Sequence, residues 1–278
     1  MLDLMLTPLI AALVILAINA YFGLHVIKRE VIFVDLAFAQ IAVLGATTAM
    51  LLGTDPGEPA SYLYTFLFTL LGSVIFSLTR LEKSRVPQEA IIGITYVVAS
   101  AAVILLSSFT AEGAEHVEET LTGSLLWITW PTVVKITIAY VIIGLFHYLL
   151  RGKMLDITFR PERVKGLRLW DFIFYLTFGI AITFSVTHAG VLLIFSTLVI
   201  PATIAFFFTA NFGKALLIAW GTGAVATVLG LLTSFQWDLA TGPVLVCSYG
   251  LVLILAGVVR RFQRVKEREG EEVVAGIN

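Results

Sequence analysis

Two polar side chains interrupt the long apolar run Val31–Gly53, and both carry oxygen atoms that can face a cation. Asp35 has a carboxylate, and Gln40 has an amide five residues further along. An ionisable group inside such a run is costly and usually faces a cavity or a partner. On a helix the two positions are about 140° apart, so one can line a path while the other faces a neighbouring helix. We predict that both line a path and that Asp35 is a candidate metal ligand; the alternative is a pairing of Asp35 with Lys28 or Arg29.

Further candidate ligands lie in the segments that connect apolar runs. Glu112 and His116 are spaced i, i+4 and would share one face of a helix, with Glu115 beside them. Carboxylates with one imidazole can gather divalent cations, but a solvated acidic loop would have the same composition. His188, in the turn THAG, is the second candidate metal ligand. Asp238 is a further candidate on the same face, or a capping aspartate.

The loop from Arg151 to Arg168 contains the pattern of a helix start. Pro161 is followed by Glu162, and a proline with an acid in the first turn is typical of a helix N-terminus. We predict that Arg160, Pro161, Glu162 and Gly166 form a short surface element that docks a soluble partner. The alternative is a plain connecting loop.

The motifs of ATP hydrolysis and of cysteine chemistry are absent from the sequence. GxxxxGK[ST] does not occur, because neither Gly152-Lys153 nor Gly213-Lys214 has the upstream glycine. Cys247 is the single cysteine, which excludes an internal disulfide and a metal site built on cysteines. We therefore expect no enzyme and no bound cofactor. If ATP drives this protein, the ATPase is a separate chain.

The composition indicates that the chain is embedded in a membrane. Of the 278 residues, 59% are hydrophobic and 13% are charged, with a mean hydropathy of +0.97. A soluble domain is about 45–50% apolar and about 25% charged. The formal net charge of −1 also excludes a disordered chain and a nucleic-acid binder. The apolar runs are continuous rather than alternating, so we predict an all-α integral membrane protein and no β-barrel.

About nine apolar runs are long enough to cross the bilayer, and eight crossings remain an alternative if one run is re-entrant or broken. Pro201 lies inside the seventh run and removes one helical hydrogen bond, so we expect a kink or a break there. We predict one transmembrane domain over residues 1–260 and a tail over 261–278. The runs are Leu6–Leu24, Val31–Gly53, Ala60–Leu78, Ala90–Phe109, Thr132–Leu150, Trp170–Thr187, Val191–Thr209, Ala215–Thr233 and Pro243–Val259.

The charged residues between the runs predict the orientation of the chain. If alternate loops lie on one side, every Lys and Arg except Lys135 lies on that side. The opposite loops contain only acidic charges. Basic loops face the cytoplasm. This partition favours nine crossings, with the N-terminus outside and the C-terminal tail in the cytoplasm.

Four segments together resemble the permease subunits of ABC importers of the zinc, manganese and iron type. They are HVIKREVIFVDLAFAQIAVLG, ITFRPERVKGLR, AGVLLIFSTLVIPATIAFF and TSFQWDLATGP, and their order and spacing carry the resemblance. Four positions depart from the family pattern. Gln40 stands where a histidine is typical, with Asp35 displaced by one position; Arg160 replaces an acid, and Ala240 replaces a proline.

The resemblance implies a multi-pass protein of a prokaryotic cell membrane that pairs with a second permease copy. It also implies cytoplasmic ATPase subunits, an extracytoplasmic metal-binding protein, and a divalent metal as transported substrate. On this basis the loop around Pro161 and Glu162 is the segment that meets the ATPase. An importer of a metal chelate or a vitamin is the first alternative. A gradient-driven carrier is the second, but it would need paired charges deep in several spans, where only Asp35 and Lys135 qualify.

Overall fold

In the computed structural model every regular element is helical across the residues it describes, which are 2–54, 58–80, 86–109, 123 and 125–275. Nine helices in these ranges are long and apolar enough to cross a membrane. The predicted all-α fold is confirmed, and the number of candidate spans in the described residues matches the nine predicted. The long helices are α1 Leu2–Lys28, α2 Val34–Leu51, α3 Pro59–Thr79, α4 Gln88–Ser107, α6 Trp130–Leu149, α8 Leu167–Ala189, α9 Val191–Phe208, α10 Phe212–Trp237 and α11 Thr241–Ala275.

Three short helices occupy the connections. η1 covers Leu125–Trp127, before α6. α7 covers Arg151–Phe159 and is followed directly by the 3-10 turn η2, Pro161–Arg163. The loop between Arg151 and Arg168 is therefore largely helical, and the docking of a soluble partner there stays a prediction.

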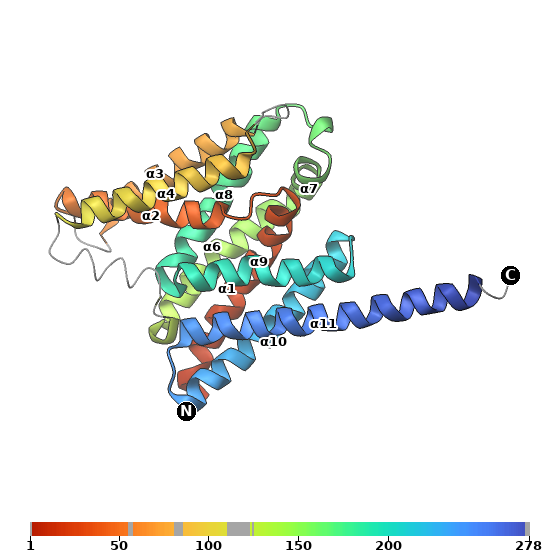
Figure 1. The fold of residues 1–278 in the computed structure, drawn as a ribbon. Coiled ribbons are helices and arrows are strands. Elements are labelled where there is room, and N and C mark those ends of the chain that lie inside the picture. Colours follow the sequence, from red (N-terminus) through yellow and green to blue (C-terminus); the bar gives the residue numbers. More distant parts are fainter. Residues whose placement is uncertain (1, 55–57, 81–85, 110–122, 124, 276–278) are drawn as a thin grey trace.

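The helix α1 passes through the middle of the molecule (Figure 1). It packs against α6, α8, α9 and α10, while α2 packs against α3, α4, α8 and α9. In each long helix we compare an apolar stretch of 18 residues. In α1 and α2, 67% of this stretch is buried inside the chain, compared with 11% in α11 and 22% in α4. Polar side chains on α1 and α2 are therefore enclosed by protein, whereas α4 and α11 present most of their apolar surface to the outside of the bundle.

Close approach between α1 and α9 depends on a glycine. A Cβ atom at Gly23 would lie 1.9 Å from the carbonyl oxygen of Leu198. Small residues allow membrane helices to bring their backbones together in this way. The helix α9 continues without interruption through Pro201, which is buried. The break expected at Pro201 is therefore absent, whereas the kink stays a prediction.

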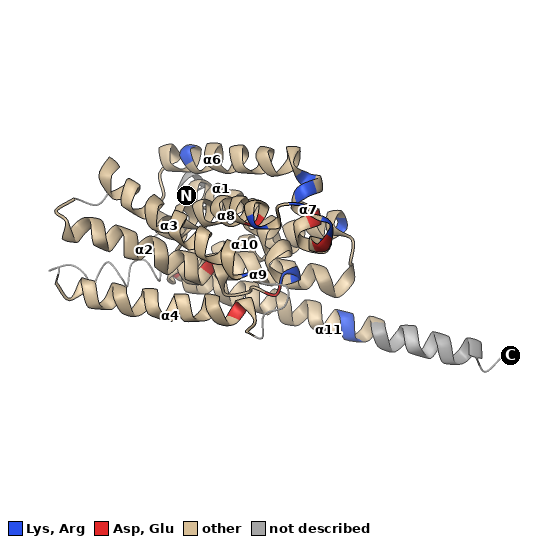
Figure 2. Ribbon diagram, turned by 90° about the horizontal axis from the view of Figure 1, so that it is seen from above, with Lys and Arg blue, Asp and Glu red and all other residues tan. Residues whose placement is uncertain are grey.

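Basic residues gather toward the end of the bundle that carries α7 (Figure 2). The exception expected from the sequence, Lys135, lies near the start of α6 and is exposed. The helix α11 extends beyond the bundle (Figure 1) and continues to Ala275, so most of the tail 261–278 is helical. The orientation of the chain across the membrane and the domain boundary at residue 260 stay predictions.

Candidate functional site

The carboxylate of Asp35 lies in the first turn of α2 and is almost completely enclosed. Asp35 is 1% exposed, and neither of its carboxylate oxygens has a hydrogen-bond partner. An unpaired carboxylate in an apolar interior is costly. A group kept in such a place is therefore a candidate for function rather than for stability.

A second acid, Glu89, lies beside the start of α2. Its Oε1 atom accepts a hydrogen bond of 2.9 Å from the backbone N–H of Phe33, while its Oε2 atom is buried without a partner. Glu89 belongs to the first turn of α4, so one helix caps the N-terminus of another. The Glu89 carboxylate acts electrostatically on that of Asp35, so the two acids lie near one another. Glu89 was not among the residues predicted from the sequence, although an acid at the start of an apolar run was a visible signal.

Gln40 lies five residues after Asp35 on the same helix and is 8% exposed. Because both side chains are buried, neither faces an open surface in the described part of the chain. A path along this helix therefore requires α2 or its neighbours to move.

The alternative pairing of Asp35 with Lys28 or Arg29 is wrong. Arg29 instead points to Asp171 at the start of α8, with 3.1 Å between Nη1 and Oδ1. The sequence could not reveal this partner, because it is 142 positions away in the chain. Asp35 is left without a counter-charge.

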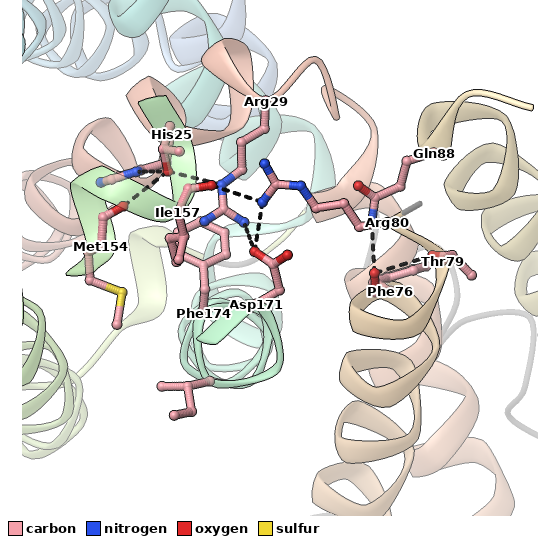
Figure 3. A network of polar contacts seen from close by, with 12 residues as sticks. His25, Arg29, Phe76, Thr79, Arg80, Gln88, Met154, Ile157, Asp171 and Phe174 are labelled. Atoms are coloured by element: carbon pink, nitrogen blue, oxygen red, sulfur yellow. Dashed lines mark hydrogen bonds and ion pairs between the residues drawn. The ribbon is translucent and has the colours of Figure 1, made fainter. Parts of the chain in front are cut away.

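Arg80 binds the same oxygen atom of Asp171, with 2.8 Å between Nη1 and Oδ1 (Figure 3). The side chains of Arg29 and Asp171 are 2% and 1% exposed, and that of Arg80 is 17% exposed. Two guanidinium groups therefore share one buried carboxylate. We call these three residues the arginine–aspartate cluster.

The arginine–aspartate cluster also holds the last turn of α7. Arg29 Nε donates to the hydroxyl of Thr158 at 3.0 Å, and Arg80 Nη1 donates to the carbonyl oxygen of Ile157 at 2.9 Å (Figure 3). The guanidinium of Arg29 also lies 3.8 Å from the ring centroid of Phe174. Burial lowers the pKa of the Arg29 guanidinium, and the neighbouring Tyr175 and Asp171 oppose that shift.

The predicted docking element begins one residue after α7. Pro161 starts the 3-10 turn η2, and Arg160 and Glu162 are exposed. Gly166 adopts a φ of 71°, a left-handed conformation that suits glycine, and leads into α8. This segment directly follows α7, whose last turn the arginine–aspartate cluster holds.

A family model described as the ABC 3 transport family matches residues 1–260. The chain belongs to the ABC 3 transport family. The family resemblance stated from the sequence motifs is confirmed, and the chain is a multi-pass membrane permease.

Two curated relatives illustrate what this ABC 3 family chain is similar to. The chelated iron transport system membrane protein YfeD of Yersinia pestis is 30% identical over 203 residues, which cover 71% of this chain and 67% of YfeD. The manganese import system permease protein ScaB of Streptococcus gordonii is 24% identical over 270 residues, which cover 94% of this chain and 93% of ScaB.

Two solved structures share the fold. PsaBC from Streptococcus pneumoniae in complex with Fab matches with a TM-score of 0.76 at 19% identity, covering 94% of both chains. An inward-facing conformation of a putative metal-chelate type ABC transporter matches with a TM-score of 0.67 at 17% identity, covering 93% of this chain and 85% of that one. At these identities the likeness shows the arrangement of the helices.

The structure does not bring the two predicted metal ligands of this ABC 3 family permease together. Asp35 lies in the first turn of α2, beside Phe33, whose ring stacks on Phe195 of α9, whereas His188 lies in the last turn of α8. No group of three or more His, Cys, Asp or Glu side chains suited to a metal occurs within the described residues.

The other outer-face candidates stay predictions. Asp238 is exposed at the end of α10 with a φ of 51°, in the left-handed region that ends many helices. Glu112, Glu115 and His116 lie outside the described residues. His188 is half-buried.

Two histidines have roles that the sequence did not indicate. His25 is 0% exposed and its Nδ1 atom is 2.7 Å from the hydroxyl of Thr158. His147 is 2% exposed and bridges Tyr21 and Thr177, at 3.0 and 2.8 Å. Helix packing therefore gives each ring an internal hydrogen-bond partner.

Proposed function

We propose that this ABC 3 family permease imports a divalent metal ion, manganese or iron before zinc, with energy from an ATPase on a separate chain. The observation that carries the proposal is the family match over residues 1–260, together with relatives named for manganese and iron transport. Transport proceeds by alternating access, in which inner segments move and the helices rock around a central path.

The enclosed start of α2 supports a path beside Asp35, Gln40 and Glu89. Buried carboxylate oxygens without protein partners are suited to a hard divalent cation that passes and leaves. Because Gln40 lies about 140° around α2 from Asp35, the ion would meet the two carboxylates and the amide at different points, and such weak coordination favours release over storage. His188, in the last turn of α8, would act at another point of such a path.

Three partners follow from this proposal. The segment with Arg160, Pro161, Glu162 and Gly166, of which all but the half-buried Pro161 are exposed, meets the ATPase on the cytoplasmic side. The outer connections, including Asp238, face an extracytoplasmic protein that delivers the ion. A second copy of the permease completes the path between two protomers.

The test is purification of the permease with co-expressed candidate ATPase chains, followed by reconstitution into proteoliposomes. The proposal expects a stable complex, ATP hydrolysis stimulated by Mn²⁺ or Fe²⁺, and ATP-dependent uptake of that ion. Flux that follows an ion gradient without any ATPase would overturn it.

A metal chelate is the second candidate substrate. Gln40 supplies an amide where an imidazole is typical of the resembling family, and YfeD is named for chelated iron. Uptake of a preformed iron chelate that free Mn²⁺ does not inhibit would favour this alternative. Equal inhibition of both fluxes by free Mn²⁺ would favour the bare ion.

A further inference from the structure

Four helices meet on the arginine–aspartate cluster. Arg29 follows the end of α1, Arg80 ends α3, and Asp171 lies in the first turns of α8. The two arginines also bind neighbouring residues of α7. Arg80 binds the carbonyl of Ile157, and Arg29 binds the hydroxyl of Thr158. The last turn of α7 is therefore fixed to α1, α3 and α8 through one point.

This point lies next to the surface that meets the ATPase in the proposed function. Only Phe159 separates Thr158 from the exposed Arg160. Two residues, Phe159 and Arg160, lie between Thr158 and η2, so a movement of η2 is passed directly to the residue that Arg29 binds. No flexible linker lies between the exposed segment and the buried charges, because α7 is helical up to Phe159.

The cluster has the properties of a positioning device rather than of a simple stabilising contact. Removing paired charges from water is costly, and well-packed apolar residues of similar size often serve stability as well or better. Apolar side chains, however, have no directional contacts. They cannot replace the hydrogen bonds that orient two guanidinium groups toward one carboxylate oxygen. Arg29 Nη2 and Asp171 Oδ2 are buried without partners, so the cluster also has unused hydrogen-bonding capacity.

We propose that Arg29, Arg80 and Asp171 are positioning residues that transmit the ATP-driven movement of α7 to the membrane helices α1, α3 and α8. This inference rests on the proposed function, because it assumes that α7 and η2 receive the movement of the ATPase. Arg80 is the critical member, since a single Nη1 group joins α3 to both α7 and α8.

The experiment measures metal uptake and ATP hydrolysis in proteoliposomes that contain the permease with its co-purifying ATPase. In Arg80→Gln, ATP hydrolysis continues while the ions transported per ATP fall by about tenfold, in the range that coupling-network substitutions produce. Arg80→Lys keeps the charge and a donor and recovers part of the ratio. Arg261→Gln, the same change at an exposed position of α11, leaves the ratio unaltered.

A triple variant separates coupling from folding. Arg29→Met, Arg80→Met and Asp171→Leu together replace the cluster by apolar side chains, and the protein is expected to keep its thermal stability. The inference requires this stable variant to hydrolyse ATP without proportionate uptake. Uptake per ATP equal to the wild type in both Arg80→Gln and the triple variant overturns it.

A measurement on the permease alone covers the case in which a variant loses its ATPase. Amide hydrogen exchange in α7 rises in Arg80→Gln if the cluster holds this helix, and unchanged exchange in α7 contradicts that role. Failure of the wild-type complex to couple ATP hydrolysis to metal uptake counts against the proposed function itself. Coupled wild type with equally coupled variants counts against this inference only.

Discussion

The Glu89 carboxylate of α4 accepts a hydrogen bond from the backbone N–H of Phe33 at 2.9 Å and so caps the N-terminus of α2 from a neighbouring helix. The free N–H groups at a helix start need an acceptor. Here the acceptor comes from a different span, and its second oxygen is buried near Asp35. The position of α2 and the acidity of the proposed path therefore depend on the same side chain.

This dual role leads to a prediction for two substitutions at Glu89. Glu89→Ala removes the cap and is expected to lower the free energy of unfolding by about 1 kcal/mol. Glu89→Gln keeps an acceptor, so stability changes by less than about 0.5 kcal/mol, while the loss of charge lowers metal uptake. Thermal unfolding in detergent and uptake in proteoliposomes measure the two effects. Equal destabilisation by both variants would contradict the capping role.

The isolated carboxylate of Asp35 predicts that stability and transport respond in opposite directions. Asp35→Asn keeps the shape and removes a buried charge without a partner, so stability is expected to be equal or higher. Uptake is expected to fall by about tenfold or more, because a contact with a charged group is worth about 1.5–3 kcal/mol.

The control for Asp35→Asn is Glu30→Gln, an acid-to-amide change at an exposed residue of the α1–α2 linker. Its uptake should match the wild type. Uptake in Asp35→Asn at the wild-type level, measured at equal expression, would remove Asp35 from the path.

The membrane spans could be predicted closely from the sequence because length and hydropathy determine them locally. Each predicted run overlaps a helix of the structure, and the run Val191–Thr209 differs from α9 by one residue at its end. The surface element around Pro161 was also visible, because proline and an acid mark a helix start regardless of what packs against it.

The partners of the buried charges could not be predicted, because nothing local specifies which helices become neighbours. The helix α2 is apolar on all sides and enclosed on most of them, so its sequence has no polar face that would indicate its orientation. The pairing of Arg29 with Asp171 and the capping by Glu89 join residues that are distant in the chain. Gly23 likewise gives no signal of its contact with Leu198.

That contact supplies a stability prediction for α1. A Cβ atom at Gly23 would lie 1.9 Å from the carbonyl oxygen of Leu198, which is backbone and cannot rotate away. Gly23→Ala is therefore expected to force α1 and α9 apart and to lower the free energy of unfolding by about 1–3 kcal/mol. Gly144→Ala is the matched control, because nothing lies within 4 Å of its Cβ position on α6. A similar melting temperature for the two variants would contradict the close contact.

The amide at position 40 predicts how the metal preference can be changed. An imidazole is a better ligand for Zn²⁺ than an amide, whereas Mn²⁺ favours carboxylate and carbonyl oxygens. Gln40→His places a ring nitrogen five residues from Asp35 in the enclosed part of α2. If both side chains line the path, the inhibition of Mn²⁺ uptake by Zn²⁺ should strengthen by about tenfold, the effect of about 1.4 kcal/mol. Gln40→Asn, which keeps an amide, controls for the altered size. If Zn²⁺ inhibits Mn²⁺ uptake equally in Gln40→His and in the wild type, the ion does not approach this position.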